Sequence, residues 1–112
     1  MTERETQSHF AKMISLLIQY ADLLGYEVTF GDAYRDPRSN GEYGQQGPYG
    51  HPNSYHKRRL AVDLNLFRDG EYLTQTNDHK RLGEFWEYLG GSWGGRWNDG
   101  NHYSYGEDSE RS

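Results

Sequence analysis

The sequence predicts an α+β fold in which a small antiparallel sheet packs against two or three helices. Three observations lead to this fold class: a helical apolar stripe near the N-terminus, strict alternation through residues 60–67, and a second helical stripe after a tight turn. A chain of 112 residues forms one domain with a modest core. Only 33% of its residues are hydrophobic, but its 10 tyrosines, 3 tryptophans and 4 phenylalanines add bulky aromatic area to that core. We expect a single domain over residues 1–106 and a disordered acidic tail at 107–112.

The first third of the chain predicts a helix followed by a strand. Ser8 or Thr6 is expected to cap the helix, and Gly25 to end it. In residues 26–30 apolar and polar side chains alternate, which indicates a half-buried strand. The apolar positions that share one face of the helix, over residues 8–24, are Phe10, Met13, Ile14, Leu17, Ala21 and Leu24.

The central strand is predicted at residues 60–67. One face is apolar and faces the core, while Asp63 lies on the opposite face. Asp69-Gly70 is typical of a tight hairpin turn, so a return strand is expected to begin at residues 71–73. The residues of the apolar face are Leu60, Val62, Leu64 and Leu66.

The last third predicts a second helix and a final strand. Asn77 or Asp78 is expected to cap the helix, and Gly90-Gly91 to end it. A strand is expected at residues 102–105. The buried stripe of the helix is formed by Leu82, Phe85, Trp86 and Leu89.

The segment 38–55 is too rich in Gly, Pro and Asn for a regular element. Two interpretations stay open: a mobile loop, or an ordered flap that three tyrosines fold over a cleft. Those tyrosines are Tyr43, Tyr49 and Tyr55.

Composition excludes several classes of protein. The net charge of -5 disfavours a protein that binds nucleic-acid phosphates. The longest apolar stretch, residues 13–18, is too short to span a bilayer, and the N-terminus lacks the basic start of a signal peptide. We therefore expect a chain that is made in the cytoplasm and has no membrane span. We also expect it to work as a monomer. Because there is no cysteine, any metal must be held by His and carboxylates.

Two polar clusters carry the candidate chemistry. His56 and Asp63 lie in the first cluster, and Asp99 and His102 lie in the second. Two imidazoles and one carboxylate match a catalytic zinc site that keeps an open position for water, and Asp99 is then a spare carboxylate for a general base. His51 is the rival to these ligands.

The predicted strands set conditions on this site. Asp63 faces away from the leucines, and the small Ala61 beside it leaves its carboxylate uncrowded. In a plain strand Asp99 and His102 would point to opposite faces, so they meet only if Gly100-Asn101 forms a turn. The plainer alternative is an Asp bonded to a loop and a solvated His.

The same reasoning applies to three other polar residues. Arg35 is a candidate cation for a developing oxyanion, although it can equally pair with Asp32 or Asp36. His9 and His79 are expected at the surface.

The two clusters together resemble the zinc peptidases that act on bacterial cell-wall peptides, the VanY-like D-Ala-D-Ala carboxypeptidases and phage L-alanyl-D-glutamate peptidases. Their signature is Ser-x-His, then Ala-x-Asp, then an acidic residue shortly before a His. Tyr34-Arg35 also resembles the family's Gly-Tyr-Arg segment. Arg59 replaces the family's usual Gly, and Asp99 stands where many members have Glu. The residues that match the signature are Ser54, His56, Ala61, Asp63, Asp99 and His102.

The resemblance implies a hedgehog/D-Ala-D-Ala-peptidase-like fold and a role for each matched residue. It implies Zn²⁺ at His56, Asp63 and His102, with Asp99 as the base. It implies that Arg35 contacts the substrate and that Ser54 contacts either the substrate or a metal ligand.

The resemblance also implies a substrate, the stem peptides of peptidoglycan. We expect a phage lysis enzyme that cuts the L-Ala–D-Glu bond and reaches the cell wall after holin-dependent release. The alternatives are a D-Ala-D-Ala carboxypeptidase or dipeptidase, and a zinc-containing cell-wall binding module without catalysis.

Overall fold

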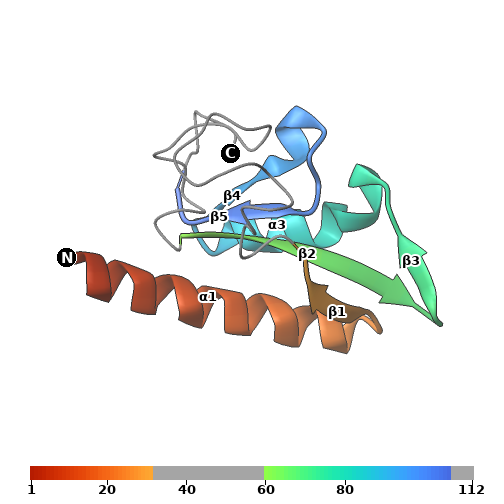
Figure 1. The fold of residues 1–112 in the computed structure, drawn as a ribbon, viewed down its shortest axis with the longest axis horizontal. Helices are drawn as coiled ribbons and strands as arrows, with labels where there is room; N and C mark the ends of the chain where they lie inside the picture. Colours follow the sequence, from red (N-terminus) through yellow and green to blue (C-terminus); the bar gives the residue numbers. More distant parts are fainter. Residues whose placement is uncertain (32–59, 107–112) are drawn as a thin grey trace, which may run out of the picture.

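The computed structural model describes residues 1–31 and 60–106, and within them it has the expected α+β fold (Figure 1). Its elements in chain order are helix α1 (Glu3–Leu23), strand β1 (Glu27–Phe30), strand β2 (Ala61–Arg68), strand β3 (Glu71–Leu73), the 3₁₀ turn η1 (Thr76–His79), helix α3 (Lys80–Tyr88), strand β4 (Ser92–Trp93), the 3₁₀ turn η2 (Gly94–Trp97) and strand β5 (His102–Ser104). Several sequence-based assignments lie outside the described residues: Arg35, the loop 38–55 with His51, Ser54 and His56, Arg59, and the tail 107–112.

Strand β2 is the centre of the antiparallel sheet. It pairs with β1 and β5, β5 pairs in turn with β4, and β3 pairs with the C-terminal end of β2. The hairpin between β2 and β3 turns at Asp69 (φ 53°) and Gly70 (φ 82°), two positive φ angles that match the twist of the strands. The predicted turn and return strand are confirmed.

Helices α1 and α3 supply the other layer, and α1 runs along one side of the sheet (Figure 1). The apolar face of β2 is buried against them as predicted, and Trp86 of α3 donates its indole N–H to the Ser104 carbonyl oxygen at 2.8 Å. Phe85 and Leu89 are only half-buried, and Phe85 stacks on Tyr20 with ring centroids 4.3 Å apart. The core cluster consists of Phe10, Met13, Ile14, Leu17, Ala21, Leu60, Val62, Leu64, Leu66, Leu82, Trp86 and Tyr103.

Helix α1 begins earlier than its apolar stripe. Thr2, rather than Ser8 or Thr6, is the N-cap: its hydroxyl accepts from the Glu5 backbone N–H at 3.1 Å, and the Glu5 carboxylate accepts from the Thr2 N–H at 2.8 Å. This capping box satisfies two backbone donors, so the helix extends through polar residues that face solvent. Gly25, with φ +91°, ends it as predicted.

The second helix also differs at its start. Asn77 and Asp78 belong to η1, and α3 begins at Lys80. The Asp78 carboxylate instead accepts from the Gln75 backbone N–H at 2.9 Å, which closes the 3₁₀ turn. Strand β4 and turn η2 were not expected, and the last strand ends at Ser104. No helix in the described ranges is long and apolar enough to cross a membrane.

Candidate metal and catalytic site

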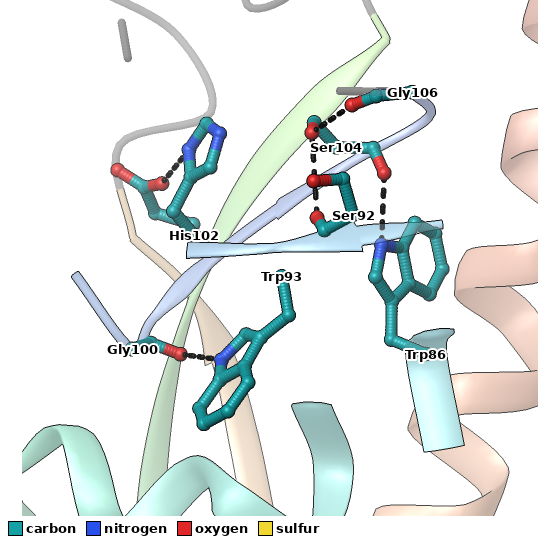
Figure 2. A network of polar contacts seen from close by, with 8 residues as sticks. Trp86, Ser92, Trp93, Gly100, His102, Ser104 and Gly106 are labelled. Atoms are coloured by element: carbon teal, nitrogen blue, oxygen red, sulfur yellow. Dashed lines mark hydrogen bonds and ion pairs between the residues drawn. The ribbon is translucent and has the colours of Figure 1, made fainter. Parts of the chain in front are cut away.

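The strand register places two of the predicted ligands side by side. Asp63 of β2 is directly opposite His102 of β5, and the His102 Nδ1 lies 3.3 Å from the Asp63 Oδ1 (Figure 2). The His102 side chain is 2% exposed and that of Asp63 is 15% exposed. Because both side chains lie on the face of the sheet opposite the leucines of β2, the core helices do not cover the pair.

The distance between these two atoms fits a shared metal ion. Two donors that each lie about 2.0–2.2 Å from a tetrahedral Zn²⁺ are about 3.3–3.5 Å apart. A direct hydrogen bond between a charged donor and a carboxylate is shorter, about 2.7–2.9 Å. The 3.3 Å separation therefore matches two ligands of one zinc ion at least as well as it matches a salt bridge.

The chain bends between Asp99 and His102, as Gly100-Asn101 predicts. The His102 backbone N–H donates to the Asp99 carbonyl oxygen at 3.1 Å, and the Asp99 N–H donates to the Gly94 carbonyl oxygen at 3.0 Å. Asp99 is exposed and borders a cavity of about 200 Å³ that Asn65 also lines, whereas Asp63 and His102 do not line it. A small polar molecule can therefore approach Asp99 from solvent.

The described residues supply only part of the predicted site. In residues 1–31 and 60–106 no group of three or more His, Cys, Asp or Glu side chains is arranged to hold a metal. His56, the third predicted ligand, and its rival His51 lie outside those ranges, as do Arg35 and Ser54. Their roles stay predictions.

His79 is not a surface residue, contrary to the sequence-based expectation. It is 3% exposed, and its Nδ1 is joined to the Tyr103 hydroxyl by a buried hydrogen bond of 2.8 Å. Burial lowers the pKa of His79 to about 4, and the nearby Asp78 opposes this shift only partly. His79 is therefore neutral at pH 7. The apolar pattern gave no sign of this, because the hydrogen bond joins two residues 24 positions apart.

Trp93 and Thr76 contact the backbone next to Asp99, although no sequence pattern indicated a role for Thr76. The Trp93 indole N–H donates to the Gly100 carbonyl oxygen at 2.7 Å, as Figure 2 shows, and the Gly100 N–H donates to the Thr76 hydroxyl at 3.2 Å. Both contacts lie within the bend that separates Asp99 from His102.

Comparison with known proteins identifies the family. A scan of protein families matches residues 49–105 to the family described as D-alanyl-D-alanine carboxypeptidase, and this span includes Ser54, His56, Asp63, Asp99 and His102 but not Arg35. A search of curated proteins finds no match. The match covers half of the chain and includes both strands that carry the Asp63–His102 pair. The chain therefore belongs to the D-alanyl-D-alanine carboxypeptidase family of cell-wall peptidases.

Proposed function

We propose that this chain is a zinc-dependent endopeptidase that hydrolyses the L-Ala–D-Glu bond of peptidoglycan stem peptides. The observation that carries the metal-dependent chemistry is the Asp63–His102 pair, with its donor atoms 3.3 Å apart across β2 and β5. Family membership supports a peptidase that acts on cell-wall peptides. The choice of bond and a setting in phage-type lysis, with holin-dependent release to the wall, are the expectations drawn from the sequence.

Each residue has a role in the proposed reaction. Asp63, His102 and His56 would hold Zn²⁺, which when bound acts as a Lewis acid and lowers the pKa of water to about 7. The Asp99 carboxylate accepts a proton from the attacking water as the water oxygen bonds to the peptide carbonyl carbon. It returns the proton to the amine nitrogen as the C–N bond breaks. Arg35 would face the developing negative charge on the carbonyl oxygen, and Ser54 would contact the substrate.

Mass spectrometry of the peptides released from purified peptidoglycan tests the activity, its metal dependence and the choice of bond together. We expect new N-terminal D-Glu on the stem peptides, and no release after treatment with a chelator until Zn²⁺ is restored. Release of free D-Ala would instead support a D-Ala-D-Ala carboxypeptidase, the candidate that the family description favours. Release that persists in chelator would contradict the zinc mechanism.

The substitution Asp99→Ala separates catalysis from binding. An enzyme should keep its zinc and lose about 10²–10⁴-fold in kcat, since that is the usual contribution of a general base. Zinc content and binding to insoluble peptidoglycan are measured beside turnover. A zinc-containing wall-binding module would keep both zinc and wall binding and would show no turnover even in the parent chain.

A further inference from the structure

The backbone between the proposed base and the metal ligand is held at every peptide group from Asn98 to His102. The Asp99 N–H donates to Gly94 O at 3.0 Å, and the Asp99 carbonyl accepts from the His102 N–H at 3.1 Å. The Gly100 N–H donates to the Thr76 Oγ1 at 3.2 Å, and the Gly100 carbonyl accepts from the Trp93 Nε1–H at 2.7 Å. The next carbonyl, that of Asn101, accepts from the Leu64 N–H of β2 at 2.9 Å. The segment is thus tied directly to the strand that carries Asp63.

Only two of these bonds come from side chains, and both bonds involve Gly100. Thr76 begins η1 and Trp93 ends β4, so the two side chains approach the bend from separate elements. The contact with Thr76 is close: a Cβ added to Gly100 would lie 2.6 Å from the Thr76 Cα and 2.9 Å from its carbonyl oxygen. Gly100 is accordingly buried, although Asp99 beside it is exposed.

This arrangement sets the direction in which the Asp99 side chain leaves the backbone. The Cα–Cβ bond of a residue is directed by the two peptide planes that flank its Cα, and at Asp99 both planes are held by hydrogen bonds. An exposed carboxylate on an unsupported bend would sample many positions. General-base catalysis requires one of them, and a misplacement of about 1 Å can cost about 10²-fold in rate.

We infer that Thr76 and Trp93 are positioning residues for the Asp99 carboxylate. Thr76 fixes the peptide group that directly follows Asp99, and Trp93 supports it by fixing the next peptide group of the bend. The inference rests on the proposed role of Asp99 as general base. Thr76 is the better residue to test, because the ring of Trp93 also packs against Gly83 of α3 and contributes to the core.

The test compares Thr76→Val with Thr76→Ser. Valine keeps the β-branched shape but cannot accept the Gly100 hydrogen bond, whereas serine restores the acceptor. We expect Thr76→Val to lose about 10–100-fold in kcat, with KM, zinc content and the melting temperature nearly unchanged, and Thr76→Ser to recover most of the activity. Thr6→Val is the matched control, since the Thr6 hydroxyl bonds only within the first turn of α1 among the contacts described.

A double-mutant cycle with Asp99→Asn distinguishes positioning from general support of the fold. If Thr76 acts through Asp99, Thr76→Val should have no further effect on the residual rate of Asp99→Asn. An equal loss in both backgrounds, or a loss accompanied by reduced zinc content, would overturn the inference. If Asp99→Asn loses activity but Thr76→Val does not, the inference fails while the proposed function stands.

Two further outcomes keep the two proposals separate. If Asp99→Asn is fully active, the general-base assignment fails and the positioning role fails with it. If Thr76→Val does not fold, Trp93→Phe is the second variant, because it removes the other side-chain hydrogen bond to Gly100. We expect Trp93→Phe to lower kcat without changing KM, and to have no further effect on the rate when it is combined with Asp99→Asn. An unchanged kcat in a folded Trp93→Phe would overturn the inference.

Discussion

The Asp63–His102 pair depends on strand register more than on local sequence. Residues that face each other in neighbouring antiparallel strands bring their side chains to the same face of the sheet. A slip of one residue in the β2–β5 pairing would move the Asp63 carboxylate away from the imidazole and turn one of the two into the core. The apolar face of β2 opposes that slip, because a slip would expose the buried side chains of Val62, Leu64 and Leu66.

Replacing His102 tests the ligand set at the level of a single residue. We expect His102→Ala to lose bound zinc, from one ion per chain to nearly none, because an imidazole is removed from a site with few ligands. Zinc content after gel filtration, measured by mass spectrometry of the metal, checks this. Asp99→Ala is the control and should retain zinc. A His102→Ala chain that keeps one zinc ion would remove His102 from the ligand set.

The burial of His79 predicts how the free energy of unfolding depends on pH. Its pKa is about 4 in the folded chain and about 6.5 when unfolded, so between these values the unfolded state binds more protons. The contribution of His79 is therefore fully present above pH 6.5 and is lost as the pH falls toward 4, by up to about 3 kcal/mol. Denaturant titrations from pH 4.5 to 7.5 should show a smaller dependence on pH in His79→Gln. His9→Gln, at an exposed position, should retain the dependence of the parent chain.

At the scale of elements, short polar contacts decide where helices and turns begin. The apolar stripe of α1 predicts the buried face of the helix but not where the helix begins, because Phe10 is the first buried residue of the helix. The capping box of Thr2 and Glu5 supplies the boundary instead. In the same way, the Asp78 carboxylate closes η1 and delays the start of α3.

The N-terminal cap gives a prediction at this scale. Thr2→Ala should reduce the free energy of unfolding by about 1 kcal/mol, because the Glu5 backbone N–H loses its acceptor. Thr2→Ser keeps the hydroxyl and should cost little. Urea denaturation monitored by circular dichroism measures both variants. If alanine and serine behave alike, the capping box contributes nothing to stability.

At the scale of the whole molecule, the sheet separates the core from the candidate site. Val62, Leu64 and Leu66 of β2 pack in the core with α1 and α3, whereas Asp63 and Asn65 lie on the other face. Asp63 and His102 come from the neighbouring strands β2 and β5. A metal bound by Asp63 and His102 would hold these two strands together.

This arrangement predicts that zinc stabilises the folded chain. A ligand that binds only the folded state at 100 times its Kd adds about 2.7 kcal/mol, which corresponds to roughly 10–20 °C in Tm for a domain of this size. Differential scanning fluorimetry of the metal-free chain, with and without added Zn²⁺, measures the shift. Asp63→Ala should abolish most of it. An equal shift in that variant would place the stabilising zinc elsewhere.

The sequence by itself determined the fold class, the apolar face of β2, the Asp69-Gly70 hairpin and the bend before His102. These features follow from periodicity and turn chemistry, which act over a few residues. It also pointed to Asp63, Asp99 and His102 as candidates. It did not reveal β4, because two residues are too short to show a period.

Only the tertiary structure decided which of these residues meet. The register that sets Asp63 opposite His102 spans 39 residues, and the bonds of Thr76 and Trp93 to Gly100 join three separate elements. His79 is buried for the same reason, since its partner Tyr103 comes from the last strand. Contacts of this kind depend on how the helices and strands pack, and no local pattern encodes them.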